Sequence, residues 1–258
     1  MPSVGILVYA LGAVALGLVG LVWDDFALVW QPVPSGIPGR AVLAGLFAAA
    51  LAAGGMTAAW RRTAAFGTAV LGLLFTVTVL LHVPRVIAHP QVLGAWSGLA
   101  EQLALASAGL VAYTSSGEVA AARSPAYRRV ALIAFGVCVL LFGAAHFGYL
   151  EETAEMVPRW LPPGQRFWAV ATGIAHLAAG AAILAGVTAH LAALLLTVMF
   201  ALFGALIHIP LLLADPHSHL YWVMNAMNLA LTGAAWVVAD SLAPARAVPA
   251  GAPAGLRP

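Results

Sequence analysis

The 258-residue sequence contains no lysine, a single cysteine and few charged residues, which make up 8% of the chain against 63% hydrophobic residues. Soluble domains carry about 25% charged residues, so a water-soluble fold of this length could not bury so much apolar surface. The composition therefore predicts an integral membrane protein. The absence of lysine excludes Schiff bases with retinal or pyridoxal phosphate, and also a P-loop lysine. Because Cys138 is alone, the sequence excludes an intrachain disulfide, a CxxC pair, an iron–sulfur cluster and a cysteine zinc site.

The positive charge is too small for a nucleic-acid partner, because eleven arginines against nine acidic residues leave a net charge of +2. No basic stripe is present either. The partner that the composition does predict is the lipid bilayer.

Hydropathy predicts eight membrane-spanning helices, each close to the roughly 20 residues that a bilayer requires. The predicted spans are residues 4–22, 41–60, 64–82, 93–113, 129–150, 166–186, 189–213 and 220–240. Two long loops, at about residues 23–40 and 151–165, lie on the side opposite to the termini. The stretch 243–258 is rich in Ala, Pro and Gly and is expected to be a disordered tail.

The distribution of arginine predicts the orientation in the membrane. Seven arginines fall on the side of the termini: Arg61, Arg62, Arg123, Arg128, Arg129, Arg246 and Arg257. Four fall on the other side: Arg40, Arg85, Arg159 and Arg166. Because cytoplasmic loops are enriched in arginine and lysine, we expect both termini to be cytoplasmic in a bacterial-type inner membrane.

The chain contains an internal repeat with an offset of 126 residues. His82-Val83-Pro84 recurs as His208-Ile209-Pro210, and Trp96 and Gln102 match Trp222 and Asn228. The sequence therefore predicts an all-α membrane protein with two tandem four-helix bundles, residues 1–118 and 119–242. An even number of helices in each unit makes the repeats parallel, related by an axis along the membrane normal.

The second unit carries a recognisable loop between its first two helices. It reads His146-Phe147, then Met156-Val157-Pro158-x-Trp160-Leu161-Pro162-Pro163, then Thr172-Gly173-Ile174-Ala175. On these residues the chain resembles the DoxX-like family of small four-helix membrane proteins, over residues ~129–240. The first unit shares this resemblance only through its match to the second unit in the internal repeat. The resemblance implies an accessory or quinone-interacting subunit of a membrane oxidoreductase system, with redox subunits of the membrane as partners. Where the family pattern has an acid, this sequence has His176.

Two ionisable residues lie inside predicted spans, where such residues are costly and usually functional. Glu101 is about 12 Å and His176 about 15 Å from the outer helix ends, at 1.5 Å per residue. With Gln102 and Asn228 beside them, they are candidates for a proton-handling pair or for a site that hydrogen-bonds a quinone carbonyl. The alternative is that neighbouring polar groups satisfy both residues, which then only fix helix packing.

A second group of candidates lies near the outer surface. His146, His208, His82 and Glu151 offer the imidazole and carboxylate ligands that suit a transition metal, and His146 with His208 is the best candidate pair for haem. The alternative reading is structural, since the repeated His-x-Pro also resembles a helix stop. The sequence itself names no cofactor, and a quinone is favoured over haem or a metal.

Arg40 and Arg166 open the second helix of each unit. They are candidates for clamping an anion, a lipid phosphate or the carboxylates of the loops, with snorkelling at the interface as the alternative.

No nucleophile–base arrangement is present, so no catalytic residue is assigned and enzymatic activity stays open. Two other functions remain beside the oxidoreductase subunit: a small-molecule transporter or carrier, and a non-catalytic membrane scaffold.

Overall fold

The computed structural model describes residues 2–116 and 124–244, and every regular element in these ranges is helical. The predictions for Arg123, Arg246, Arg257 and nearly all of the 243–258 tail fall outside the described residues. The described elements are α1 (Val4–Trp23), η1 (Leu28–Trp30), α2 (Arg40–Ala59), α3 (Ala64–Ala88), α4 (Leu93–Thr114), α5 (Ser124–Gly148), α6 (Leu150–Met156), α7 (Gln165–Ala185), α8 (Ala189–Phe203), η2 (Gly204–His208), α9 (Ile209–Ala214) and α10 (His219–Leu242).

Seven helices in the described part of the chain are long and apolar enough to cross a membrane, which supports a multi-pass membrane protein. They are α1, α2, α3, α5, α7, the continuous stretch α8–η2–α9, and α10. Helix α4 is the remaining long helix, and it carries the polar pair Glu101 and Gln102. None of its residues is exposed, so α4 faces protein and has little need of an apolar surface.

Most helix ends lie within two residues of the span ends predicted from hydropathy, and three differences are larger. Helix α3 runs on through Pro84 to Ala88, so the predicted stop at residue 82 is wrong. Helix α5 begins five residues before the predicted span, at Ser124. The predicted loop 151–165 contains α6, whose first turn carries Glu151 and Glu152. Acidic side chains stabilise a helix N-terminus through the helix dipole.

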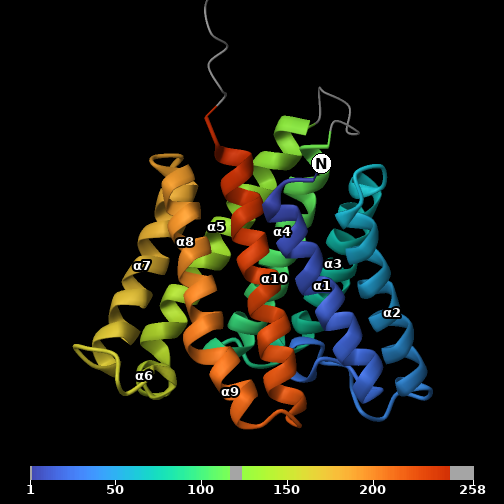
Figure 1. Ribbon diagram of the computed structural model, residues 1–258, viewed down its shortest axis with the longest axis horizontal. Coiled ribbons are helices and arrows are strands. Elements are labelled where there is room, and N and C mark those ends of the chain that lie inside the picture. The colour runs from blue at the N-terminus through green and yellow to red at the C-terminus, as the bar shows by residue number, and fades with distance from the viewer. Residues whose placement is uncertain (1, 117–123, 245–258) are drawn as a thin grey trace, which may run out of the picture.

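The two halves of the chain pack in the same pattern. In the first half α1 packs on α2 and α3 packs on α4; in the second half α5 packs on α7 and α8 packs on α10. Across the halves α1 packs on α10, α4 packs on α5, and α4 also contacts α10. Figure 1 shows the result: α2 and α3 lie at one flank and α6, α7 and α8 at the other, with α1, α4 and α10 between them.

Both ends of the described chain lie at the same end of the bundle, where the α2–α3 connection is also found (Figure 1). That connection carries Arg61 and Arg62. The long 24–39 and 157–164 connections lie at the opposite end.

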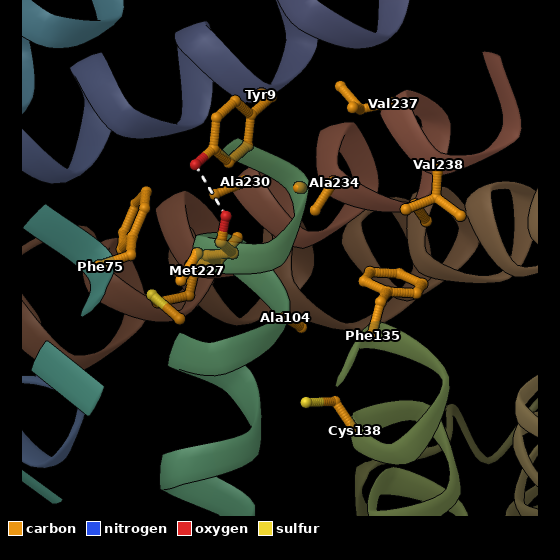
Figure 2. Packing of buried hydrophobic residues seen from close by; sticks show 14 of the residues in the cluster. Tyr9, Phe75, Ala104, Phe135, Cys138, Met227, Ala230, Ala234, Val237 and Val238 are labelled. Atoms are coloured by element: carbon orange, nitrogen blue, oxygen red, sulfur yellow. Dashed lines mark hydrogen bonds between the residues drawn. The ribbon is translucent and has the colours of Figure 1, made fainter. Parts of the chain in front are cut away.

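The core is built from small residues that bring helices into close contact. A Cβ atom on Gly233 of α10 would lie 2.1 Å from the backbone nitrogen of Tyr9 in α1, and one on Gly12 of α1 would lie 2.4 Å from Ala230 in α10. The Tyr9 side chain passes through this interface, and its hydroxyl donates a hydrogen bond of 2.9 Å to the carbonyl oxygen of Leu105 in α4 (Figure 2). The same close-up shows Phe75, Phe135, Cys138 and Met227 filling the space around α4. Small residues at helix contacts are typical of membrane proteins.

Indole groups at the loop end of three helices bond to the chain that precedes them. The Nε1–H groups of Trp96, Trp168 and Trp222 each donate to a proline carbonyl six residues earlier, at 2.9 Å. Tryptophan is enriched where membrane meets water, so these bonds mark one interface of the bundle.

Candidate functional site

The structure brings together two histidines that the sequence analysis had assigned to different sites. His176 lies in the middle of α7 and is 1% exposed, and His146 lies near the end of α5. Their ring centroids are 4.6 Å apart, with an angle of 43° between the ring planes. This imidazole pair is the centre of the candidate site.

Three phenylalanines surround the pair. The ring centroid of His176 lies 6.1 Å from that of Phe142 in α5, 5.6 Å from Phe200 and 6.2 Å from Phe203 in α8. The Phe203 ring also stacks on His146 at 6.3 Å. The five side chains come from α5, α7 and α8, and we call them the aromatic cluster. The site is therefore a cluster of aromatic side chains in the helix interior that contains two imidazoles.

The hydrogen bonds of the two rings determine which nitrogen carries the hydrogen. His146 Nδ1 lies 2.9 Å from the carbonyl oxygen of Phe142, and His176 Nδ1 lies 2.8 Å from that of Thr172. A carbonyl oxygen only accepts, so Nδ1 donates in both rings, and in the neutral imidazole Nε2 is the acceptor. The expected hydrogen bond from His176 to a quinone carbonyl therefore does not fit the neutral ring. A hydroxyl group is the ligand donor that does fit.

Glu101 belongs to a different contact. Its carboxylate accepts a hydrogen bond from the indole Nε1–H of Trp30, which lies in the short helix η1 of the 24–39 connection. Among the described residues it shares no hydrogen bond or ion pair with His176. The structure thus places these two intramembrane candidates in separate clusters.

Gln102 connects α3, α4 and α10. Its Oε1 accepts a hydrogen bond of 2.8 Å from the Thr78 hydroxyl, and its Nε2 lies 3.8 Å from the sulfur of Met227. One turn beyond Thr78, His82 is buried, with Nδ1 donating to the Thr78 carbonyl at 2.9 Å and Nε2 without a hydrogen-bond partner among the described residues. A Cβ on Gly98 would lie 2.9 Å from that Nε2, so α4 covers the ring closely.

Asn228, the repeat counterpart of Gln102, bonds to the backbone of the helix that carries Phe200. Its side-chain amide donates to the carbonyl oxygen of Phe200 at 3.1 Å, one turn before the π-helical turn η2. A Cβ on Gly204, at the start of η2, would lie 2.7 Å from the same amide nitrogen. Asn225 donates to the carbonyl of His208 at the other end of η2, at 2.8 Å. Two asparagines of α10 thus hold both ends of the wider turn.

The π-helical turn changes the environment of His208. In a π-turn the hydrogen bond runs from residue i+5 to residue i, and the Ile209 amide accordingly bonds to the Gly204 carbonyl. That carbonyl is the i−4 partner of His208, and the ring Nδ1 of His208 has no partner among the described residues. His82, by contrast, keeps its i−4 bond in the regular helix α3.

The two arginines bind carboxylates in their own loops. Arg40 pairs with Asp25 and its guanidinium lies 5.3 Å over the ring of Phe26. Arg166 pairs with Glu151 at 2.7 Å, and both of these side chains are exposed. Of the binding partners considered for Arg40 and Arg166, the structure shows carboxylates, those of Asp25 and Glu151.

The residues that could hold a metal are dispersed. Within residues 2–116 and 124–244, no three His, Cys, Asp or Glu side chains come together as a metal-binding group. His146 contacts His176 instead of His208, and Glu151 is engaged with Arg166.

Sequence analysis did not identify the phenylalanines of the aromatic cluster, nor Trp30 as the partner of Glu101. A usable signal existed for the cluster, because Phe142 precedes His146 by four residues and Phe200 precedes Phe203 by three, which are same-face spacings on a helix. The pairing of Trp30 with Glu101 joins residues 71 positions apart and has no local signal.

One protein family matches the part of the chain that holds this site. A domain of unknown function (DUF8561) matches residues 135–239, from within α5 to within α10. The match spans less than half of the chain and includes the whole aromatic cluster. No curated protein and no solved structure matches the chain.

Proposed function

We propose that the protein is a quinol-interacting accessory subunit of a membrane oxidoreductase system, and that the aromatic cluster binds the ring of the quinol. The observation that carries this proposal is the imidazole pair, whose Nε2 atoms are acceptors among phenylalanine rings. The DoxX-like resemblance of the same segment supports the association with oxidoreductases.

A hydroquinone matches the aromatic cluster in three properties. Its hydroxyl groups are hydrogen-bond donors, and an imidazole Nε2 is an acceptor. Its flat ring packs well against aromatic side chains, edge to face or with offset stacking. It is soluble in the membrane, and α7 and α8 lie at one flank of the bundle (Figure 1). When bound, the quinol would supply electrons and protons to the redox partner subunits of the proposed system, while this chain's residues orient the ring and accept hydrogen bonds from its hydroxyl groups.

The proposal includes the membrane topology. We propose eight spans in two tandem units, with both termini in the cytoplasm of a bacterial-type inner membrane. Helix α4 would be the eighth span, shielded from lipid by the surrounding helices. The shared position of both chain ends and of Arg61 and Arg62 supports this orientation.

The first test is binding of a water-soluble hydroquinone to the purified full-length chain in detergent, measured by titration calorimetry. We expect His176→Phe and His146→Phe to weaken binding roughly two- to tenfold each, because a hydrogen bond contributes about 0.5–1.5 kcal/mol. The oxidised quinone form should bind more weakly than the hydroquinone to the unmodified protein, since a carbonyl offers no donor to Nε2.

His82→Phe is the matched control, because His82 is equally buried and makes the same Nδ1 bond to the preceding turn, but lies outside the aromatic cluster. It should leave hydroquinone binding unchanged. Equal losses in the His82 and His176 variants, or equal affinity for both oxidation states, would refute the assignment.

A further inference from the structure

A cleft of about 380 Å³ opens between the loop after α6 and the η2–α9 segment. Its walls are mainly apolar, with Met156 and Trp160 on the loop side and Leu206, Ile207 and Leu211 on the helix side. This volume lies within the range of about 300–1,000 Å³ that small-molecule sites occupy. The cleft is thus large enough for part of a ligand and is suited to an apolar one.

The polar groups of the cleft do not form a binding site of their own. The side-chain amide of Gln165 donates to the backbone carbonyl of Val157 at 2.6 Å, within the cleft wall. Glu155 and Arg159 also line the cleft, and both are exposed. Polar residues are therefore at its margin while the surface between them is apolar.

The cleft lies about one helical turn from the aromatic cluster along the same helix. Phe203, whose ring contacts both histidines, directly precedes η2, and Ile207 of the cleft wall follows it by four residues. At about 1.5 Å per residue this is a separation of roughly 6 Å along the helix. The π-helical turn itself supplies Ala205, Leu206 and Ile207 to the wall.

We infer that this cleft holds the alkyl or prenyl chain of the ligand whose ring lies in the aromatic cluster. Lipid-soluble hydroquinones carry such a chain on the ring, and the apolar wall of the cleft offers this chain van der Waals contacts. This inference rests on the proposed function and adds the class of ligand: a ring with a long apolar substituent, held at two adjoining places on α8–η2.

In the first half of the chain, the positions that correspond to the η2 side of the cleft have different surroundings. Thr78 occupies the position of Gly204, and its hydroxyl bonds to Gln102 within a regular helix. The position that corresponds to Leu206 is Leu80, which is 62% exposed. The repeat therefore provides a control at a matched site that the ligand would not contact.

The test compares Leu206→Trp with Leu80→Trp in the full-length protein. Two probes are titrated: a dimethoxy-methyl-hydroquinone without a side chain, and the same hydroquinone with a decyl chain. The unmodified protein should bind the decyl compound more tightly. Leu206→Trp fills the cleft, so we expect it to lower the affinity for the decyl compound at least tenfold while leaving the chain-free compound unaffected. Leu80→Trp should change neither affinity.

The outcomes separate this inference from the proposed function. If the unmodified protein binds the chain-free compound but the decyl compound keeps its advantage in Leu206→Trp, the cleft does not hold the chain, and the ring site stands. Equal loss in both tryptophan variants also overturns the inference, because the loss would then not come from the cleft. If the unmodified protein binds neither probe, the proposed function and this inference fall together.

Discussion

Three histidines of this bundle each use one ring nitrogen in a hydrogen bond to their own helix, which leaves the other nitrogen for a ligand. His82, His146 and His176 all direct Nδ1 to a carbonyl oxygen four residues earlier. This bond satisfies the donor where no water is available and leaves Nε2 as the chemically active atom. The same local geometry therefore gives an acceptor in all three rings, and only the surroundings distinguish them.

The sequence identified His176 but not its partner, and the reason is geometric. Depth was counted from the predicted end of each span, so His146, near the end of α5, was placed at the surface. In the structure the chain continues as helix α6 one residue after α5 ends, so the end of α5 is not the end of the helical structure. A Cβ on Gly173, in the middle of α7, would lie 3.0 Å from His146. The depth of a side chain follows from the neighbouring helix, which a single sequence does not reveal.

Gly233→Ala tests the close contact between α1 and α10. The added Cβ would lie 2.1 Å from the Tyr9 backbone nitrogen, and backbone cannot move aside as a flexible side chain can. We expect a loss of about 1–3 kcal/mol in the free energy of unfolding, the usual cost of overpacking. The single cysteine Cys138 is fully buried, so a thiol-reactive dye added during heating reports the unfolding transition.

The matched control is Gly45→Ala on α2, where nothing lies within 4 Å of the added Cβ. It should stabilise the helix by up to about 1 kcal/mol, because alanine has the higher helix propensity. An equal fall of the unfolding midpoint in Gly233→Ala and Gly45→Ala would mean that the loss of stability does not come from the α1–α10 contact.

At the scale of helices, the repeated His-x-Pro does not stop a helix in either half. Helix α3 contains Pro84 within regular α-helix, whereas the second half changes to π-helix before Pro210. The residues that differ are Thr78 and Gly204, at the same repeat position. Thr78 bonds to Gln102, while Gly204 leaves room for Asn228 to reach the Phe200 carbonyl. The sequence showed the proline but not which hydrogen bonds would replace the lost one.

Pro84→Ala and Pro210→Ala should therefore differ. In α3 the substitution restores an N–H group opposite the Leu80 carbonyl in a regular helix, where an internal proline costs about 3 kcal/mol. We expect a higher unfolding midpoint, by roughly 1–3 kcal/mol in stability. Pro210 is the second residue of α9 and directly follows the π-helical turn, in which the regular i−4 hydrogen bonds are already replaced, so its substitution should have a smaller effect. The Cys138 labelling experiment measures both, and an equal gain in the two variants would contradict this account.

At the scale of the whole molecule, close contacts recur at matched positions in the two halves. A Cβ on Gly17 would lie 2.5 Å from the carbonyl oxygen of Ala48, and one on Gly143 would lie 3.0 Å from that of Gly173. The offsets between these positions are 126 and 125 residues, the one-residue difference falling in the first long loop. This geometry supports the proposed duplication independently of the His-x-Pro motif.

Hydropathy predicted the bounds of most long helices to within two residues because lipid requires apolar surface over a fixed length, but seven rather than the predicted eight helices qualify as membrane spans in the described part of the chain. It is least informative for α4 and α10, the helices that other helices enclose. Helix α10 has the lowest mean hydropathy of the seven candidate spans, 1.3, and α4 does not qualify as a candidate. Helices that face protein are free to carry residues such as Glu101 and Gln102, so polarity here reflects position in the bundle.

Whether α4 crosses the membrane decides the side on which Ser115 lies. The test places one cysteine in a chain with Cys138→Ala, either as Ser115→Cys after α4 or as Gly36→Cys in the 24–39 connection. Both positions are exposed, and a Cβ on Gly36 meets nothing within 4 Å. With eight spans and cytoplasmic termini, a membrane-impermeant thiol reagent on intact cells should label Gly36→Cys only. Ser115→Cys should react once the membrane is opened, which shows that the position is accessible. Labelling of both variants from outside would place Ser115 and Gly36 on the same side of the membrane. Helix α4 would then be a buried helix that does not span the membrane. The two termini could not lie on one side, as two four-span units require.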